Sequence, residues 1–190
     1  RDPFVMYENG VYYLYGTRAA HFGCCTGGFD VYTSDDLREW SAPVACFDSA
    51  KYGLNIKANW ALEVHKYKDK YYMFATFTRK SNNLRGTFVL KADSPLGPFV
   101  NAKRILHPFS IDSHIVQNEA GLFLFYSSNK FEGERIGTCI YVDRMLDPFT
   151  PEGNPVLVVE PTLDEDIYQK NRYKPGQHWH TIEGAFYFKE

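Results

Sequence analysis

The chain repeats one pattern four times: an acidic residue opens a short apolar run, and a turn then leads to an aromatic-rich segment. The four runs begin at Asp2, Glu63, Asp112 and Glu183, and the sequence ends within the last one. A repeat of this length predicts a fold built from similar units, each with a carboxyl group at the same place. If the units close into a ring, these carboxyl groups converge on its centre.

The composition favours a β-rich globular domain. Of the 190 residues, 44% are hydrophobic, 23% are charged and 17% are aromatic. Large flat rings suit the pleated surface of a sheet, and helical periodicity is nearly absent. The formal net charge of −2, without any Lys/Arg-dense run, argues against a nucleic-acid partner. No apolar stretch approaches the ~20 residues of a membrane-spanning helix, so no membrane partner is expected.

The sequence does not assign a cellular compartment. It begins at Arg1 without a methionine and already inside the first repeat, so we expect a short N-terminal part to be missing. A secreted or periplasmic location is slightly favoured over a cytoplasmic one. Cys24, Cys25, Cys46 and Cys139 lack the spacing of zinc ligands, and free or buried thiols are expected. A disulfide from Cys24 or Cys25 to Cys46 stays open if the protein is exported.

The second half of each unit repeats as well. Glycine leads a third strand at Gly28, Gly86 and Gly137, and a fourth strand follows in each unit. Units of four antiparallel strands are typical of β-propeller blades, whose first strand lines the central channel. We predict an all-β, incomplete β-propeller. Its blades should span about 1–50, 58–106 and 109–160, with the start of a fourth at about 179–190. Because propeller rings have about 4 to 8 blades, three and a fraction blades indicate a fragment of one domain.

Five motifs, in order along the whole chain, resemble those of glycoside hydrolase family 43. They are RDPF at 1–4, WALEV at 60–64, ADSPLGPF at 92–99, SID at 110–112 and IEG at 182–184. Each is weak alone, but their order and their phase with the blades make the set specific. The resemblance implies a catalytic, five-bladed β-propeller that hydrolyses α-L-arabinofuranosyl or β-D-xylosyl linkages of plant cell-wall glycans, with inversion at the anomeric carbon.

The resemblance also implies catalytic roles for three acidic residues. Asp2 matches the general base that activates water, and Glu183 matches the general acid that protonates the leaving oxygen. Asp112 matches the residue that orients this acid and tunes its pKa. These roles agree with physical expectation, because an inverting glycosidase holds two carboxyl groups about 6.5–9.5 Å apart to admit a water molecule. A neighbouring carboxylate helps a general acid to keep its proton near neutral pH.

Four further residues are candidates for substrate contacts. Glu63 and Trp60 lie in the second-blade motif, where Leu62 replaces the proline usual in the family. The resemblance implies that Glu63 hydrogen-bonds sugar hydroxyls, and Trp60 is expected to stack on a sugar face or to pack in the channel wall. His114 shares a strand face with a predicted catalytic acid, because side chains alternate along a strand. Trp179 lies just before the predicted general acid, in a loop that suits either sugar recognition or no function.

No metal-binding residue and no required cofactor are predicted. His21, His65 and His107 lack the spacing of metal ligands. Many members of the family carry a cation in the channel, so the resemblance allows a structural calcium ion (Ca²⁺) whose ligands lie outside this chain. The expected partner is an oligo- or polysaccharide substrate such as arabinan, arabinoxylan or xylo-oligosaccharides.

Two other functions stay open. A non-catalytic carbohydrate-binding propeller would keep the blades without turnover; Leu62 and the absent last blade favour it, and the three retained acids count against it. A related clan acts on fructosyl substrates with acids on a five-bladed propeller. Its Asn-Asp-Pro-Asn and Glu-Cys motifs are replaced here by RDPF and by Glu183-Gly184, so this function is less favoured.

Overall fold

The computed structural model describes residues 2–18 and 27–188, and most of their regular structure is β-strand. The first sheet contains β1 (Phe4–Glu8), β2 (Val11–Thr17), β3 (Gly28–Ser34) and β4 (Val44–Asp48). The second contains β5 (Ile56–Tyr67), β6 (Lys70–Arg79), β7 (Arg85–Ala92) and β8 (Val100–Arg104). The third contains β9 (Ser110–Asn118), β10 (Gly121–Lys130), β11 (Gly137–Asp147), β12 (Thr150–Pro151), β13 (Val156–Val159), β14 (Ile167–Gln169) and β15 (Trp179–Thr181), with the 3-10 helix η1 (Asp164–Asp166) before β14.

The first two sheets confirm the predicted units of four antiparallel strands. In each, the strands lie in chain order and every strand pairs with the next one. The first hairpin shows how the sequence directs this arrangement. Its two turn residues, Asn9 and Gly10, have φ angles of 51° and 85°. An Asn-Gly pair in this left-handed conformation forms the turn whose twist matches two antiparallel strands.

The third sheet departs from the simple repeat at its far end. β12 and β13 pair with β11 as outer strands, but β15 pairs with β11 in parallel, with Gly137 opposite His180. A side chain at Gly137 would not fit, because its Cβ would lie 2.0 Å from the His180 carbonyl oxygen. Residues 179–190 were expected to open a fourth blade. In the described structure β15 belongs to the third sheet and residues 182–188 form no strand, and the fourth blade stays a prediction.

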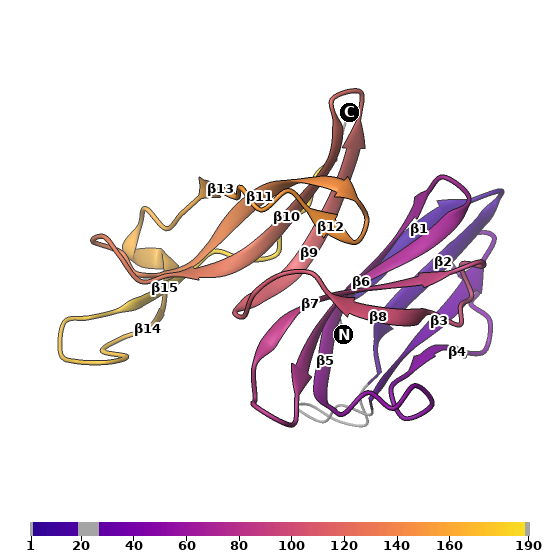
Figure 1. The fold of residues 1–190 in the computed structure, drawn as a ribbon, viewed down its shortest axis with the longest axis horizontal. Helices are drawn as coiled ribbons and strands as arrows, with labels where there is room; N and C mark the ends of the chain where they lie inside the picture. The colour runs from indigo at the N-terminus through magenta and orange to yellow at the C-terminus, as the bar shows by residue number, and fades with distance from the viewer. Residues whose placement is uncertain (1, 19–26, 189–190) are drawn as a thin grey trace.

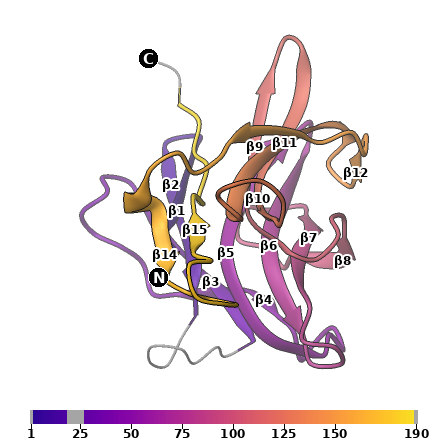
Figure 2. The ribbon, with the colours of Figure 1, turned by 90° about the vertical axis from the view of Figure 1, so that its left-hand side faces the viewer.

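The three sheets follow one another around the molecule. In Figure 1 the first two sheets lie together on the right, and the third extends to the left with β14 and β15 at its far end. Figure 2, which looks from the side of the third sheet, shows β14 and β15 in front with β10 and β11. The arrangement is that of an incomplete β-propeller.

Two hydrophobic cores fill the spaces between successive sheets. The core between the first and second sheets contains the stacked rings of Phe29, Phe47 and Phe77. The ring centroid of Phe77 lies 6.1 Å from that of Phe29 and 5.4 Å from that of Phe47. The core between the second and third sheets contains Phe74 and Leu124. Because Phe74 and Phe77 point to opposite faces of β6, this strand serves both cores.

The cysteines that the structure describes agree with the prediction. Cys46 and Cys139 are buried, free thiols. Cys24, Cys25 and His21 lie outside the described residues. Among the residues that are described, no helix has the length and apolar character needed to cross a membrane.

Candidate active site

Two of the predicted acidic residues occupy the same kind of backbone irregularity. Asp2 and Asp112 have positive φ angles of 54° and 51°. In β5, the first strand of the second sheet, Ala61 has this conformation, with φ 42°. The pairing register skips Ala61 in β5 and Asp112 in β9, so both lie in β-bulges. A bulge bends its strand and redirects the side chain, which explains how Asp112 leaves the alternating pattern of β9.

The bulges correct the repeat that was inferred from the sequence. Counted from the bulge, Glu63 corresponds to His114, and the position in phase with the acids of the other sheets is Ala61. Glu183 is also out of phase, because the left-handed residue in its segment is Gly184, with φ 75°. The four acids therefore do not occupy one repeated position. The reason is that the bulge marks the equivalent point of β5 and β9, and at this point β5 carries an alanine and β9 an aspartate.

Three of the acids nevertheless line one cavity. Asp2, Asp112 and Glu183 lie in the wall of a cavity of about 570 Å³, whose other lining residues come from the second and third sheets and their connections. Trp60 and Trp179 line the same cavity. The Oγ1 hydroxyl of Thr17 donates a hydrogen bond to Asp2 Oδ2 at 3.0 Å, which orients this carboxyl group. Five of the seven predicted site residues are thus brought together.

The charges in the cavity act mainly on Asp112. Burial, reinforced by the negative charges of Glu183 and Asp2, raises the pKa of Asp112 to about 6. The guanidinium of Arg85 opposes this rise. The carboxyl group of Asp112 therefore holds a proton over a mildly acidic range in which an exposed aspartate, with a pKa near ~3.9, is already ionised.

Arg85 is a site residue that the sequence reasoning missed. It is the first residue of β7, and its side chain lines the cavity. Its guanidinium carbon lies 4.2 Å from the ring centroid of Trp60 and 5.6 Å from that of Phe109, so two aromatic rings hold the cation in place. The only sequence signal was an arginine directly before Gly86, the glycine that leads a third strand.

The two tryptophans differ in what covers them. The ring of Trp60 carries the guanidinium of Arg85 above it. Trp179 is 3% exposed, with the guanidinium carbon of Arg172 at 4.5 Å and the ring of Phe131 at 5.5 Å from its centroid. Much of the indole surface of Trp179 is therefore already packed. A sugar that enters the cavity meets mainly the rim of Trp179 in this arrangement.

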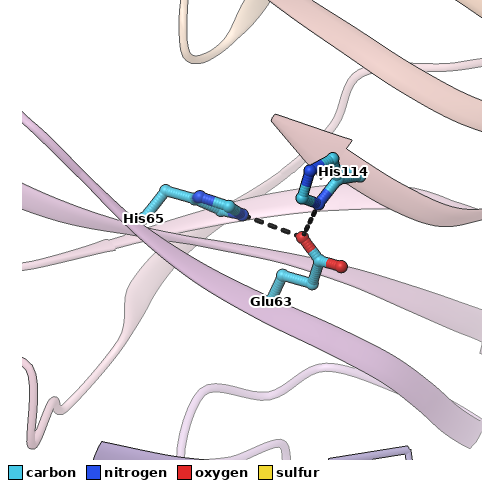
Figure 3. Close-up of side chains that lie close together, drawn as sticks. All are labelled: Glu63, His65 and His114. Atoms are coloured by element: carbon cyan, nitrogen blue, oxygen red, sulfur yellow. Dashed lines mark hydrogen bonds and ion pairs between the residues drawn. The ribbon is translucent and has the colours of Figure 1, made fainter. Parts of the chain in front are cut away.

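Glu63 and His114 lie outside the wall of this cavity and form a separate cluster with His65. Figure 3 shows the two imidazole rings pointing at one carboxyl group, with Glu63 and His65 on β5 and His114 on β9. Glu63 Oε2 lies 2.7 Å from His114 Nδ1 and 2.9 Å from His65 Nε2. The burial of Glu63 alone would raise its pKa, but the hydrogen bonds to His114 and His65 outweigh burial and lower it. Glu63 is therefore an ionised acceptor that both rings share.

His65, which the sequence did not single out, belongs to the cluster with Glu63 and His114. The sequence analysis set His65 aside because it lacks metal-like spacing, but Glu63 and His65 are two residues apart on one strand and share a face. Among the described residues, Glu63, His65 and His114 form a group whose ligand atoms lie within 4.8 Å of one another. Two imidazoles and one carboxylate suit zinc-like metals, whereas calcium prefers six to eight oxygen ligands. The group does not fit the expected calcium ion.

The model of the family described as "Glycosyl hydrolases family 43" matches residues 1–189. No curated protein matches the chain.

Several solved structures share the fold. An endo-arabinase from Bacteroides thetaiotaomicron VPI-5482 has 30% identity and a TM-score of 0.69; the match covers 83% of this chain and 55% of that one. An endo-1,4-beta-xylanase from the same organism has 25% identity and a TM-score of 0.69, with 88% and 55% covered. An alpha-L-arabinofuranosidase from Lactobacillus brevis has 18% identity and a TM-score of 0.68, with 87% and 55% covered, and shares the fold alone. The chain spans about half the length of these structures.

Proposed function

Because the chain belongs to glycosyl hydrolases family 43, we propose that the protein hydrolyses α-L-arabinofuranosyl or β-D-xylosyl linkages of plant cell-wall glycans. The observation that carries the proposal is the placement of Asp2, Asp112 and Glu183 in the wall of one cavity. The endo-arabinase and the endo-1,4-beta-xylanase among the similar structures support this substrate class. Arabinan, arabinoxylan and xylo-oligosaccharides are the substrates to test.

We assign the chemical steps to Asp2 and Glu183. The carboxylate of Asp2 accepts a proton from a water molecule as that water attacks the anomeric carbon. On the opposite side of the sugar, the carboxyl group of Glu183 gives its proton to the leaving oxygen, and the glycosidic bond breaks with inversion. The hydrogen bond from Thr17 supports this role for Asp2, because it fixes the orientation of the carboxyl group toward the cavity.

Asp112 is proposed to control the proton on Glu183. The charge of Glu183 contributes to the raised pKa of Asp112, which means that the two carboxyl groups repel each other when both are ionised. This repulsion supports Asp112 as the residue that orients and tunes the general acid Glu183.

Trp60, Trp179 and Arg85 are proposed to shape the sugar site. The packed cation above Trp60 leaves less of that ring for stacking, so we assign hydrogen bonds to sugar hydroxyls to the Arg85 guanidinium. Trp179 contributes its rim, because its faces are in contact with other side chains. A structural calcium ion in the channel of the full-length protein stays a proposal with ligands other than Glu63, His65 and His114. Calorimetric titration of chelator-treated protein with Ca²⁺ tests it.

The proposed function is tested by kinetics of the full-length protein on 4-nitrophenyl α-L-arabinofuranoside and β-D-xyloside. Asp2→Asn should lower kcat on these substrates by about 10²–10⁴-fold, and Glu183→Gln should do so on arabino- and xylo-oligosaccharides, whose leaving groups need a proton; this is the usual contribution of a general base or acid. Activity unchanged by both substitutions would refute the proposal. Binding of arabino- or xylo-oligosaccharides without any turnover by the wild type would instead identify a carbohydrate-binding propeller.

The stereochemistry needs a separate measurement. The first sugar released should have the inverted anomeric configuration when the reaction is followed by proton NMR. A first product with retained configuration would contradict the roles assigned to Asp2 and Glu183, even if both residues are essential.

A further inference from the structure

The segment that carries Glu183 has few fixed points in the structure. Ile182 N–H donates to the Thr138 carbonyl oxygen at 3.0 Å, just before Glu183. Directly after it comes Gly184, whose positive φ of 75° makes a sharp change of direction, and whose N–H reaches Ser127 Oγ at 3.3 Å. Residues 182–188 form no strand, so the course of the chain beyond this pivot depends on contacts other than a sheet ladder.

One such contact comes from His114. The backbone N–H of Tyr187 donates a hydrogen bond to His114 Nε2 at 3.1 Å, and the ring of Phe186 lies 5.0 Å from the His114 ring. Because Nε2 accepts a proton donor here, a neutral His114 carries its own proton on Nδ1. That Nδ1–H points at Glu63 Oε2, 2.7 Å away.

The carboxylate of Glu63 therefore decides which nitrogen of His114 carries the proton, and so whether Nε2 can accept a hydrogen bond from Tyr187. An ionised carboxylate beside Nδ1 stabilises the tautomer with the proton on that nitrogen, and this leaves Nε2 as the acceptor for Tyr187. His65 donates to the same oxygen of Glu63 from Nε2, which holds the carboxylate in place. His114 is only 5% exposed, so water does not readily replace either of its partners.

We propose that Glu63 and His114 are positioning residues: the chain of hydrogen bonds from Glu63 through His114 to Tyr187 fixes the segment that presents Glu183 to the cavity. This assigns Glu63 a role other than the sugar contact expected from the sequence. It agrees with the geometry, because Glu63 and His114 lie outside the wall of the cavity that contains Asp2, Asp112 and Glu183. The inference rests on the proposed role of Glu183 as general acid.

The test uses the dependence of kcat on the leaving group in the full-length protein. A displaced general acid lowers kcat little for an activated leaving group such as 2,4-dinitrophenol, which departs without protonation. It lowers kcat much more for a poor leaving group such as the hydroxyl group of another sugar. His114→Asn keeps an amide N–H near the place of Nδ1 but lacks an acceptor for Tyr187. We expect it to lower kcat on the poor leaving group by about 10- to 100-fold and on the activated one by less than about 3-fold. His114→Gln, which can place an oxygen near Nε2, should retain most of the activity.

Two controls separate this role from other effects. His107→Asn changes an exposed histidine outside the network and should leave kcat unchanged. Glu63→Gln is nearly isosteric and provides a second variant if His114→Asn does not fold. It should lower kcat on the poor leaving group several-fold, because a neutral amide fixes the His114 tautomer less firmly. Far-UV circular dichroism of every variant checks folding.

Several results would overturn the proposal. Equal losses on both leaving groups, or a raised KM with unchanged kcat, would make Glu63 and His114 sugar contacts. Stoichiometric binding of Zn²⁺ that needs Glu63 and is required for turnover would make the group a metal site. Glu183→Gln serves as the reference. The expected pattern is a larger loss of kcat on the poor leaving group than on the activated one. If Glu183→Gln shows this pattern but His114→Asn and Glu63→Gln do not, only the positioning role is refuted. If Glu183→Gln does not show it, the proposed function is refuted.

Discussion

Replacing Asp112 by asparagine should stabilise the folded protein at neutral pH while it impairs catalysis. In the folded state the pKa of Asp112 is about 6, whereas an unfolded aspartate has a pKa near ~3.9. The folded state thus binds the proton of Asp112 more tightly than the unfolded state does. By linkage, the ionised side chain costs stability: the cost is absent below about pH 4, grows between about pH 4 and 6, and is complete above that.

The magnitude follows from the gap between the two pKa values. At ~1.36 kcal/mol for each pKa unit, a gap of about two units corresponds to at most about 3 kcal/mol at pH 7. Asparagine removes this cost, and its side chain tolerates the left-handed backbone at this position, where φ is 51°. A backbone penalty should therefore not mask the gain.

Urea unfolding of the full-length protein at several pH values measures the effect. Asp112→Asn should raise the free energy of unfolding at pH 7 by up to about 3 kcal/mol, and the difference from wild type should vanish near pH 4. Asp69→Asn, at an exposed turn position between β5 and β6, is the matched control and should change little. A gain at pH 7 that persists unchanged at pH 4 would refute the electrostatic explanation, and so would no gain at either pH.

Three further predictions follow from the described contacts. Arg85→Met removes a positive charge that opposes the rise in the pKa of Asp112, so that pKa should rise further and stability should fall more between pH 5.5 and 8 than in wild type, as measured by urea unfolding. Gly137→Ala should cost more than about 3 kcal/mol, because its Cβ would lie 2.0 Å from a backbone oxygen of β15, whereas Gly86→Ala meets its nearest atom at 3.5 Å and should cost less than about 1 kcal/mol; thermal unfolding of the pair decides this. Phe77→Ala should cost about 3–5 kcal/mol, since this ring is 1% exposed and stacks within the first core, and urea unfolding measures the loss.

Much of the fold could be predicted from local patterns. Aromatic runs separated by turn residues such as Asn9-Gly10 determine where a chain pairs with its own next segment, and the four-stranded units follow from that local pairing. The parallel pairing of β15 with β11 could not be predicted this way. It joins segments far apart in the sequence and depends on the absence of a side chain at Gly137, which is visible only once the partner strand is in place.

The site shows the same division between local and spatial information. The repeated motif placed Asp2 and Asp112 in phase, and in the structure both have a left-handed backbone. Glu63 was wrongly aligned with these acids, because no sequence pattern indicates that Ala61 occupies a bulge. Arg85 carries no motif at all. Its importance comes from the aromatic rings and carboxyl groups that folding brings around it.

The use of both faces of β6 limits how chains of this kind can change in length. Phe77 and Met73 point into one core and Phe74 into the other, so a single-residue insertion or deletion within Lys70–Arg79 would move the side chains on one side of the change to the opposite faces and mispack both cores at once. Insertions in the hairpin turns carry no such consequence. Variation in length among natural and engineered chains with this architecture should therefore accumulate in the connections and spare the middle strand.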